Sequence, residues 1–346
     1  MTNEEQKTPW YKKRDILHVF GAIVIVLLLF SVFIMAINYS FPSFFTLAPQ
    51  SAVGEAKAVD DDIEEATTSA APPPAEWKKG LMTANTLIVI SEDLFSNWLP
   101  NDKVWPTIFL DNPQNYQLGQ LEMLRYTTRV MRDKLTRLRT TDKIDEDCEQ
   151  AFTLLSNDPL KWMLPSAESK YKEATGRLRN YRDRLATGNE EIFYPRADNL
   201  SELLDQYVSL LGGVNTRLAN APKGQRNKIS EESAGEADVS RAEQLVDTKV
   251  PWSKIDDNFY YAQGVAYVLR QMMVAIKYDF SEILEVKKAS AQVDSIIEVL
   301  NQAQFEPWAV LNGDIGSMLA NHSMELHSLL ENARQKIRNL NDMLRQ

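Results

Sequence analysis

The chain has 346 residues, a formal net charge of −10 at pH 7, and charged side chains at 25% of its positions. No run of lysine and arginine forms a stripe that would follow a phosphate backbone, so nucleic acid is not expected as a partner. The single cysteine, Cys148, excludes an intrachain disulfide and a cage of several thiolates around a metal ion.

The first predicted element is a transmembrane helix at residues 16–37. This stretch carries no formal charge, and at ~1.5 Å of rise per residue it would cross the ~30 Å hydrocarbon core of a bilayer. Basic residues cluster before it, and the next basic residue after it is Lys57. The positive-inside rule therefore places the tail, residues 1–15, in the cytoplasm. A cleaved signal peptide is the alternative, but its apolar core is usually only ~7–15 residues long.

Aromatic residues flank the apolar stretch, as anchors at the two membrane–water interfaces do. They are Trp10 and Tyr11 before it, and Tyr39, Phe41, Phe44 and Phe45 after it. Residues 48–76 are rich in Ala, Pro, Ser and acidic residues and contain no aromatic residue. Such a composition buries too little apolar surface to offset the entropy of ordering, which predicts that residues 38–76 form a juxtamembrane stretch and a disordered linker.

Helical periodicity dominates residues 77–346, which predicts an all-α fold in the form of a helical bundle. Apolar residues recur every three or four positions from Leu121 to Leu138. A near-heptad stripe from Ile315 to Leu344 predicts a long helix that packs inside the domain or forms a dimer seam. Residues 220–237 are polar and contain glycine, which predicts a flexible loop. Further helices are expected at Thr83–Leu99, Asp145–Leu155, Ser166–Thr187 (with Ser166 as its cap), Asn199–Leu218, Asp256–Lys288 and Ala289–Gln302.

Tryptophan and proline occur together throughout the chain. All seven tryptophans lie within three residues of a proline. Proline ends helices, so the rings of the soluble part are predicted to fill corners between helices, where each buries ~150–250 Å². The alternative is a binding groove with aromatic walls and a few polar groups. Its walls would be Trp98, Trp105 and Trp162, and its polar groups Asp102, Asp111, Asn112, Gln117 and Glu168.

No catalytic residue, metal ligand or cofactor is predicted. The Asx-rich turns stand beside prolines or at helix starts, where capping is the favoured role, and no calcium-loop pattern occurs. His322 and His327 would lie ~140° apart on a regular helix, which is unsuitable for one metal ion. His322 is instead expected as a hydrogen-bonded residue of the C-terminal seam. Nucleophilic catalysis is not expected, because the part of the chain after the apolar stretch has few nucleophile and base candidates: Cys148, two histidines and no G-x-S-x-G motif.

Five long motifs follow one another along the chain: WLPNDKVWP, LDNPQNYQLGQLE, NDPLKWMLPSAESKY, RADNL and KIDDNFYYAQG. This succession resembles the uncharacterised Gram-negative bacterial family called domain of unknown function 2333, from about Trp77 to about Phe280. The N-terminal anchor is also as in that family. The resemblance implies an inner-membrane protein whose helical domain faces the periplasm. It brings no activity, substrate or catalytic residue.

Three functions are compatible with these features. The favoured one is a non-catalytic interaction or scaffold factor of the cell envelope, anchored in the inner membrane by residues 16–37 and able to bind an envelope protein or a second copy of itself. The second is a periplasmic ligand-binding or sensing module with an aromatic groove. The third is a murein-active hydrolase or lyase that uses Glu168, since glycosidases need two carboxyl groups ~5–9.5 Å apart. Filled corners together with an exposed apolar patch would favour the scaffold, whereas a deep aromatic groove in which Glu168 and Asp102 converge would favour a ligand or a reaction.

Overall fold

The computed structural model describes residues 18–31, 41–47, 78–102, 111–139, 141–188, 191–219, 255–307, 310–311 and 320–346. Every named regular element in these ranges is a helix, which confirms the all-α prediction. The helices are α2 (Leu81–Ser96), α3 (Asp111–Val130), the π-helix η3 (Met131–Leu135), α4 (Glu146–Leu155), α5 (Ala167–Thr187), α6 (Ala197–Ala219), α8 (Ile255–Asp279), α9 (Ser281–Val286), α10 (Ser290–Gln302) and α11 (His322–Arg345).

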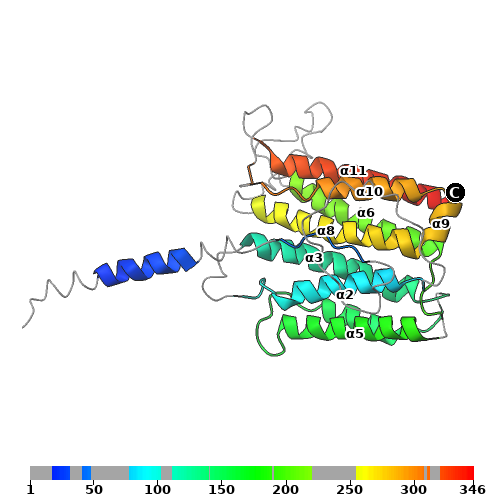
Figure 1. Ribbon diagram of the computed structural model, residues 1–346, viewed down its shortest axis with the longest axis horizontal. Coiled ribbons are helices and arrows are strands. Elements are labelled where there is room, and N and C mark those ends of the chain that lie inside the picture. The colour runs from blue at the N-terminus through cyan, green and yellow to red at the C-terminus, as the bar shows by residue number, and fades with distance from the viewer. Residues whose placement is uncertain are drawn as a thin grey trace, which may run out of the picture.

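The long helices lie side by side and run back and forth between two ends of a bundle (Figure 1). Asn115 in the first turns of α3 donates to Asp257 at the start of α8, at 2.8 Å, so these two helices start at the same end. At the other end, the buried carboxylate of Asp279 closes α8 and accepts from the backbone N–H of Thr83 at the start of α2, at 2.7 Å. The first end is called the entry end below, and the second the far end.

Helices α3 and α8 cross at two glycines. A Cβ atom added to Gly119 would lie 2.1 Å from the carbonyl oxygen of Tyr261, and one added to Gly264 would lie 2.0 Å from that of Tyr116. Only glycine permits such a close approach of two helix backbones. The crossing therefore fixes the spacing of the two helices that form the middle of the bundle.

The C-terminal stripe packs inside the domain. Leu326, Leu330, Ala333, Ile337 and Leu340 are completely enclosed, and α11 contacts α6 and α10. The described part of the stripe is thus covered by helices of the same chain, as the packing interpretation predicted. His322, at the start of α11, accepts a hydrogen bond from the backbone N–H of Leu311 through Nδ1 at 3.0 Å, which confirms its expected hydrogen-bonded role.

A short extended segment, residues 41–47, lies along α8. The ring of Phe41 stacks on Tyr260 with a centroid distance of 5.4 Å, and the ring of Phe44 stacks on Tyr267 at 5.6 Å. Both stacks are nearly parallel, with interplanar angles of 9° and 4°. Phe41 also contacts Tyr116 of α3 at 4.8 Å, so the segment meets the bundle at the entry end.

Hydrogen bonds fix the backbone of this segment. The hydroxyl of Tyr267 donates to the carbonyl oxygen of Ser43 at 3.1 Å, and the amide of Gln271 donates to that of Phe45 at 3.1 Å. The sequence predicts that these residues lie in a juxtamembrane stretch, with their rings at the membrane–water interface. The structure differs, because residues 41–47 pack on the bundle, where the rings of Phe41 and Phe44 stack on tyrosines of α8.

The remaining N-terminal predictions are only partly covered by the structure. Residues 18–31 form a helix inside the predicted span of 16–37. In the part of the chain that the structure describes, no helix combines the length and the apolar character needed to cross a membrane. The predicted tail 1–15, the linker residues 48–76, the loop 220–237 and Trp105 lie outside the described residues.

Candidate functional site

Trp98 fills a corner at the entry end, just after α2. Its side chain is only 2% exposed, and its ring packs edge-on against Phe95 at 5.7 Å and Tyr171 at 5.3 Å. The indole N–H donates to the carbonyl oxygen of Pro159 at 3.1 Å. The packing role that the sequence favoured therefore accounts for this ring, which has no face open to a ligand.

Gln117 is buried beside the same corner. Its side-chain oxygen accepts from the backbone N–H of Leu99 at 2.8 Å, and its amide donates to the carbonyl oxygen of Asn97 at 2.7 Å. Backbone groups just past the end of α2 have no helical partner of their own, so this amide satisfies them from α3. Gln117 thus joins two helices.

The other predicted site residues differ in their solvent exposure and lie at different places in the fold. Asp102 is half-buried, and this burial raises its pKa above the ordinary value. Asp111 is exposed as the first residue of α3 and accepts from the backbone N–H of Asn112 at 3.1 Å. Glu168 lies in the first turn of α5, where a carboxylate stabilises the helix dipole. Trp162 is 61% exposed, so it and the enclosed Trp98 do not form one wall.

A feature missed by the sequence interpretation is an exposed apolar loop between α4 and α5, residues 160–164. Leu160 is 50% exposed, Met163 63% and Leu164 97%, and Trp162 lies between them. The signal was present as LKWML before Pro165. The sequence predicts a corner or a groove for its tryptophan. The proximity of tryptophan to proline does not indicate whether the ring is exposed.

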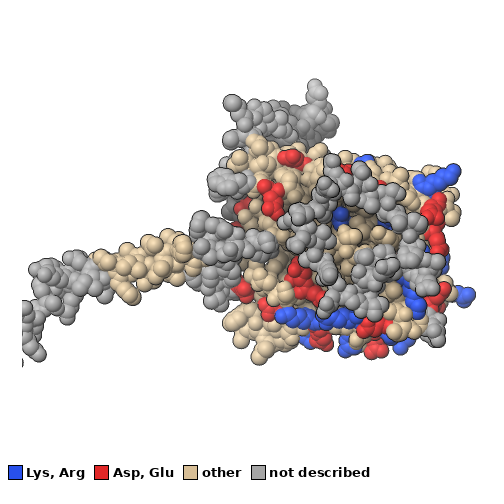
Figure 2. Space-filling view, viewed as in Figure 1, with Lys and Arg blue, Asp and Glu red and all other residues tan. Residues whose placement is uncertain are grey.

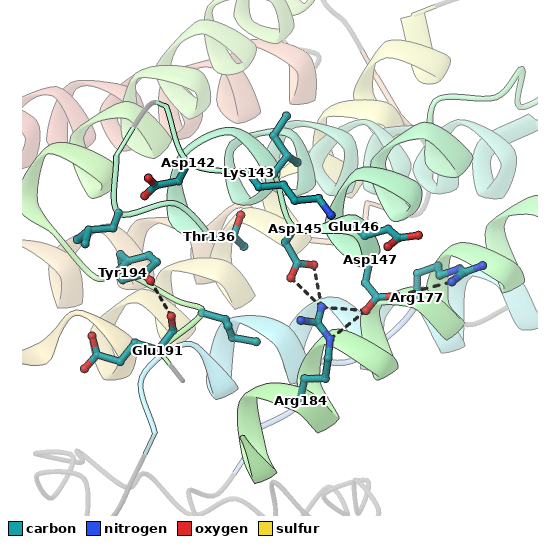
Figure 3. A pocket seen from close by; sticks show the side chains of 13 residues that line it. Thr136, Asp142, Lys143, Asp145, Glu146, Asp147, Arg177, Arg184, Glu191 and Tyr194 are labelled. Atoms are coloured by element: carbon teal, nitrogen blue, oxygen red, sulfur yellow. Dashed lines mark hydrogen bonds and ion pairs between the residues drawn. The ribbon is translucent and has the colours of Figure 1, made fainter. Parts of the chain in front are cut away.

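A hollow lies at the far end, where η3, α4 and α5 meet (Figure 3). It is an open pocket of about 690 Å³. Five acidic and three basic side chains line it, so its charge is mixed with an acidic excess. The lining residues are Thr136, Leu138, Asp142, Lys143, Ile144, Asp145, Glu146, Asp147, Arg177, Arg184, Glu191, Ile192 and Tyr194.

Arg184 holds the charged wall of this pocket together. Its guanidinium donates to both carboxylate oxygens of Asp145, at 2.9 and 2.7 Å, and to Asp147 at 2.8 and 3.1 Å. Arg177 adds an ion pair to Asp147 at 3.7 Å. Asp145 caps the N-terminus of α4 through the backbone N–H of Cys148. The wall is therefore a preorganised network whose charges largely satisfy one another.

The π-helix sets the opposite wall. The backbone N–H and the hydroxyl of Thr136 both donate to the carbonyl oxygen of Met131, each at 3.1 Å, which ends η3 at the pocket rim. The backbone N–H of Tyr194 donates to the carbonyl oxygen of Leu135 at 2.8 Å. Single π-turns inside helices often accompany functional sites, because the extra residue redirects the chain that follows.

The model of one protein family, described as an uncharacterised protein conserved in bacteria (DUF2333), matches residues 6–346 of the chain. The protein belongs to the DUF2333 family. Searches of curated proteins and of solved structures found no match. The family assignment extends the resemblance seen in the motifs over nearly the entire chain, and its description carries no activity.

The chemistry available in this DUF2333 protein follows from its buried groups. Cys148 lies beneath the pocket wall and is 1% exposed. Burial, together with the nearby Asp145 carboxylate, raises the pKa of its thiol well above the ordinary value. A thiol that is both protonated and enclosed is a poor nucleophile. Within the described residues, no group of three or more His, Cys, Asp or Glu side chains is placed to hold a metal ion.

Proposed function

We propose that the protein is a non-catalytic interaction or scaffold factor of the bacterial cell envelope. It is anchored in the inner membrane by residues 16–37, with its N-terminus in the cytoplasm and its helical bundle in the periplasm. The uncharged apolar stretch and the excess of basic residues on its N-terminal side support this topology. Membership of a bacterial family is compatible with it.

The observation that carries the proposal is the packing of residues 41–47 on α8. Phe41 follows the predicted membrane span by only four positions and is already stacked on Tyr260. Four residues of extended chain reach at most ~14 Å. The entry end of the bundle would therefore be held against the membrane, and the far end would point into the periplasm. A bundle presented in one orientation is suited to binding a partner in the same compartment.

The far-end pocket is the surface that such a partner would meet. Its Arg184 network already pairs Asp145 and Asp147 without a ligand, which would reduce the ordering entropy lost on binding. Its acidic excess suits a partner that brings basic side chains. Trp98 and Gln117, two of the described groups of the predicted aromatic groove, are instead engaged in packing and in hydrogen bonds to backbone groups.

A periplasmic ligand-binding module is the second candidate, and the pocket volume favours it. A hollow of about 690 Å³ lies within the ~300–1,000 Å³ range of small-molecule sites. Its charged lining distinguishes it from most such sites, which are largely apolar. The third candidate, a murein hydrolase or lyase, draws no support from the position of Glu168. This carboxylate lies in the first turn of α5, where it stabilises the helix dipole.

Two experiments test the scaffold proposal. Alkaline phosphatase fused after Gln346 should be active in the periplasm, and an inactive fusion that is stably produced would refute the topology. A photo-crosslinking amino acid at Lys143, on the pocket rim, should capture an envelope protein in cells. The same amino acid at Asn180, exposed on the middle of α5, is the matched control. Equal capture at both positions, or none, would refute the far-end surface, and hydrolysis of glycan strands by the purified protein would refute a non-catalytic role.

A further inference from the structure

The apolar loop, residues 160–164, is exposed although its backbone is fixed. The indole N–H of Trp98 donates to the carbonyl oxygen of Pro159, and the side-chain amide of Asn101 donates to that of Lys161 at 3.2 Å. The carbonyl of Lys161 also accepts from the backbone N–H of Ala167 at 2.8 Å. These bonds hold the loop from both sides, so the outward direction of its side chains is set by the fold.

Arg125 strengthens this arrangement from α3. Its guanidinium donates to the carbonyl oxygens of Leu155 and Asn157, both at 2.7 Å. Tyr171 of α5 donates to the same carbonyl of Asn157 at 2.8 Å. The end of α4 and the start of the loop are thus fixed to two neighbouring helices. A loop that is held at its start and carries four large apolar side chains in solvent favours a partner, because soluble surfaces seldom collect such residues in one place.

The loop lies at the entry end. Pro159, just before the loop, accepts a hydrogen bond from Trp98. The residue after Trp98 is Leu99, whose backbone N–H donates to Gln117 of α3. The neighbour of Gln117 is Tyr116, against which Phe41 packs. In Figure 1 the loop is the green stretch that precedes α5, at the end of the bundle from which the blue N-terminal helix leads away. In Figure 2 the corresponding corner of the bundle is mostly tan, the colour of residues other than Lys, Arg, Asp and Glu.

We infer that the apolar loop inserts into the interfacial layer of the bilayer that holds the N-terminal anchor. The inference rests on the proposed function, because it requires residues 16–37 to span that membrane and Phe41 to lie near its surface. The loop composition suits the interface: tryptophan concentrates at the headgroup level, leucine and methionine enter the acyl boundary, and Lys161 meets anionic headgroups. The loop is a second contact that fixes the tilt of the bundle above the membrane.

The experiment uses the full chain with Cys148 replaced by alanine. An environment-sensitive fluorophore is attached to a cysteine that replaces Leu164, which is 97% exposed, so the change leaves the core intact. The matched control carries the same label at Val286, which is 80% exposed and lies on α9 at the far end. Both proteins are reconstituted in vesicles of phosphatidylethanolamine and phosphatidylglycerol, with or without lipids that carry a spin label near the headgroup.

The label at position 164 should shift to shorter emission wavelengths and lose most of its fluorescence with spin-labelled lipids. The label at position 286 should keep the emission wavelength that it has in water, and spin-labelled lipids should not quench it. Equal responses at the two positions, or quenching only at 286, overturn the inference. Capture of an envelope protein by a photo-crosslinker at position 164 in cells, in place of lipid quenching, also overturns it.

Flotation of the same vesicles separates this inference from the proposed function. A chain that does not float with the vesicles overturns both, because neither anchor nor loop then holds it. A chain that floats while the label at 164 stays in water overturns the loop contact alone and leaves the N-terminal anchor in place.

Discussion

Replacing Gly264 by alanine should destabilise the bundle by forcing α3 and α8 apart. The new Cβ atom would lie 2.0 Å from the carbonyl oxygen of Tyr116, whereas ordinary contact begins at 3.4 Å, so the backbones must separate by roughly 1.4 Å, the difference between these distances. A gap of ~0.5–1 Å already removes a quarter to a half of the dispersion attraction between facing atoms. We expect a gross cost of ~3–4 kcal/mol in the free energy of unfolding. Alanine returns ~1 kcal/mol through its higher helix propensity.

The same substitution at Gly176 is the matched control. This glycine lies in α5 and has nothing within 4 Å of its added Cβ atom, so alanine should stabilise the protein by ~0.5–1 kcal/mol. The two variants should thus differ by ~3 kcal/mol, or ~6–12 °C in Tm at the ~2–4 °C per kcal/mol typical of domains of this size. Thermal unfolding of the full chain in mild detergent, followed by circular dichroism, measures this difference.

The double variant tests the geometry further. Gly119→Ala alone should cost about as much as Gly264→Ala, since its Cβ would lie 2.1 Å from the carbonyl oxygen of Tyr261. Once one alanine has separated the helices, the second meets less resistance, so the pair should cost clearly less than the sum of the single changes. If Gly264→Ala melts at or above Gly176→Ala, α3 and α8 do not cross at these glycines and the reasoning fails.

Two substitutions and one labelling experiment probe the core of the entry end and the buried thiol. Trp98→Ala should cost ~3–5 kcal/mol in stability, and an almost unchanged melting curve would place the ring at the surface. Burial raises the pKa of Tyr171 from 10.0 to about 12, so its contribution to stability is present below pH 10 and is lost as the pH rises from 10 to about 12. Tyr171→Phe should lose less stability than the parent chain over that interval, and equal losses in alkaline urea titrations would contradict this. Cys148, enclosed and protonated, should react with iodoacetamide at pH 8 only as fast as the protein unfolds; rapid labelling without unfolding would show an accessible thiolate.

The sequence predicted the helices whose signals are local. Ser166 was expected to cap α5, and its hydroxyl accepts from the backbone N–H of Ser169 at 3.3 Å. The C-terminal stripe predicted a packed helix because its apolar period extends over many turns, and α11 buries that face. Helix ends were less exact. The range Asp256–Lys288 divides into α8 and α9, because Asp279 ends the first helix where it caps α2.

The aromatic segment after the apolar stretch could not be assigned from its composition. Phe41 and Phe44 suit a membrane interface and an aromatic helix face equally well, because both surround a ring with apolar atoms and polar groups. What decides between them is the row of tyrosines on α8. Tyr267 donates to the carbonyl of Ser43 from 224 residues away in the sequence. No periodicity links two segments at that separation.

The two tryptophans of the predicted groove also show that burial cannot be predicted from the neighbouring sequence alone. Trp98 and Trp162 each stand near a proline, yet the first is 2% and the second 61% exposed. Burial of Trp98 depends on Phe95, one turn earlier on α2, and on Tyr171, which arrives from α5. Trp162 lies in a loop whose backbone is held by that same Trp98, so packing one ring fixes the exposure of the other.

The position at which the chain joins the bundle determines how far the bundle could move from the proposed membrane anchor. If the bundle began at Trp77, the forty residues after Ile37 would let it range up to ~130 Å from the membrane, at ~3.3 Å per residue. Because Phe41 already stacks on Tyr260, four residues set the reach at ~14 Å. The far-end pocket would stand about one length of α8 above the bilayer, ~38 Å for its 25 residues. A partner must come to that height, so the proposed scaffold acts as a fixed platform and cannot search the periplasm on a long tether.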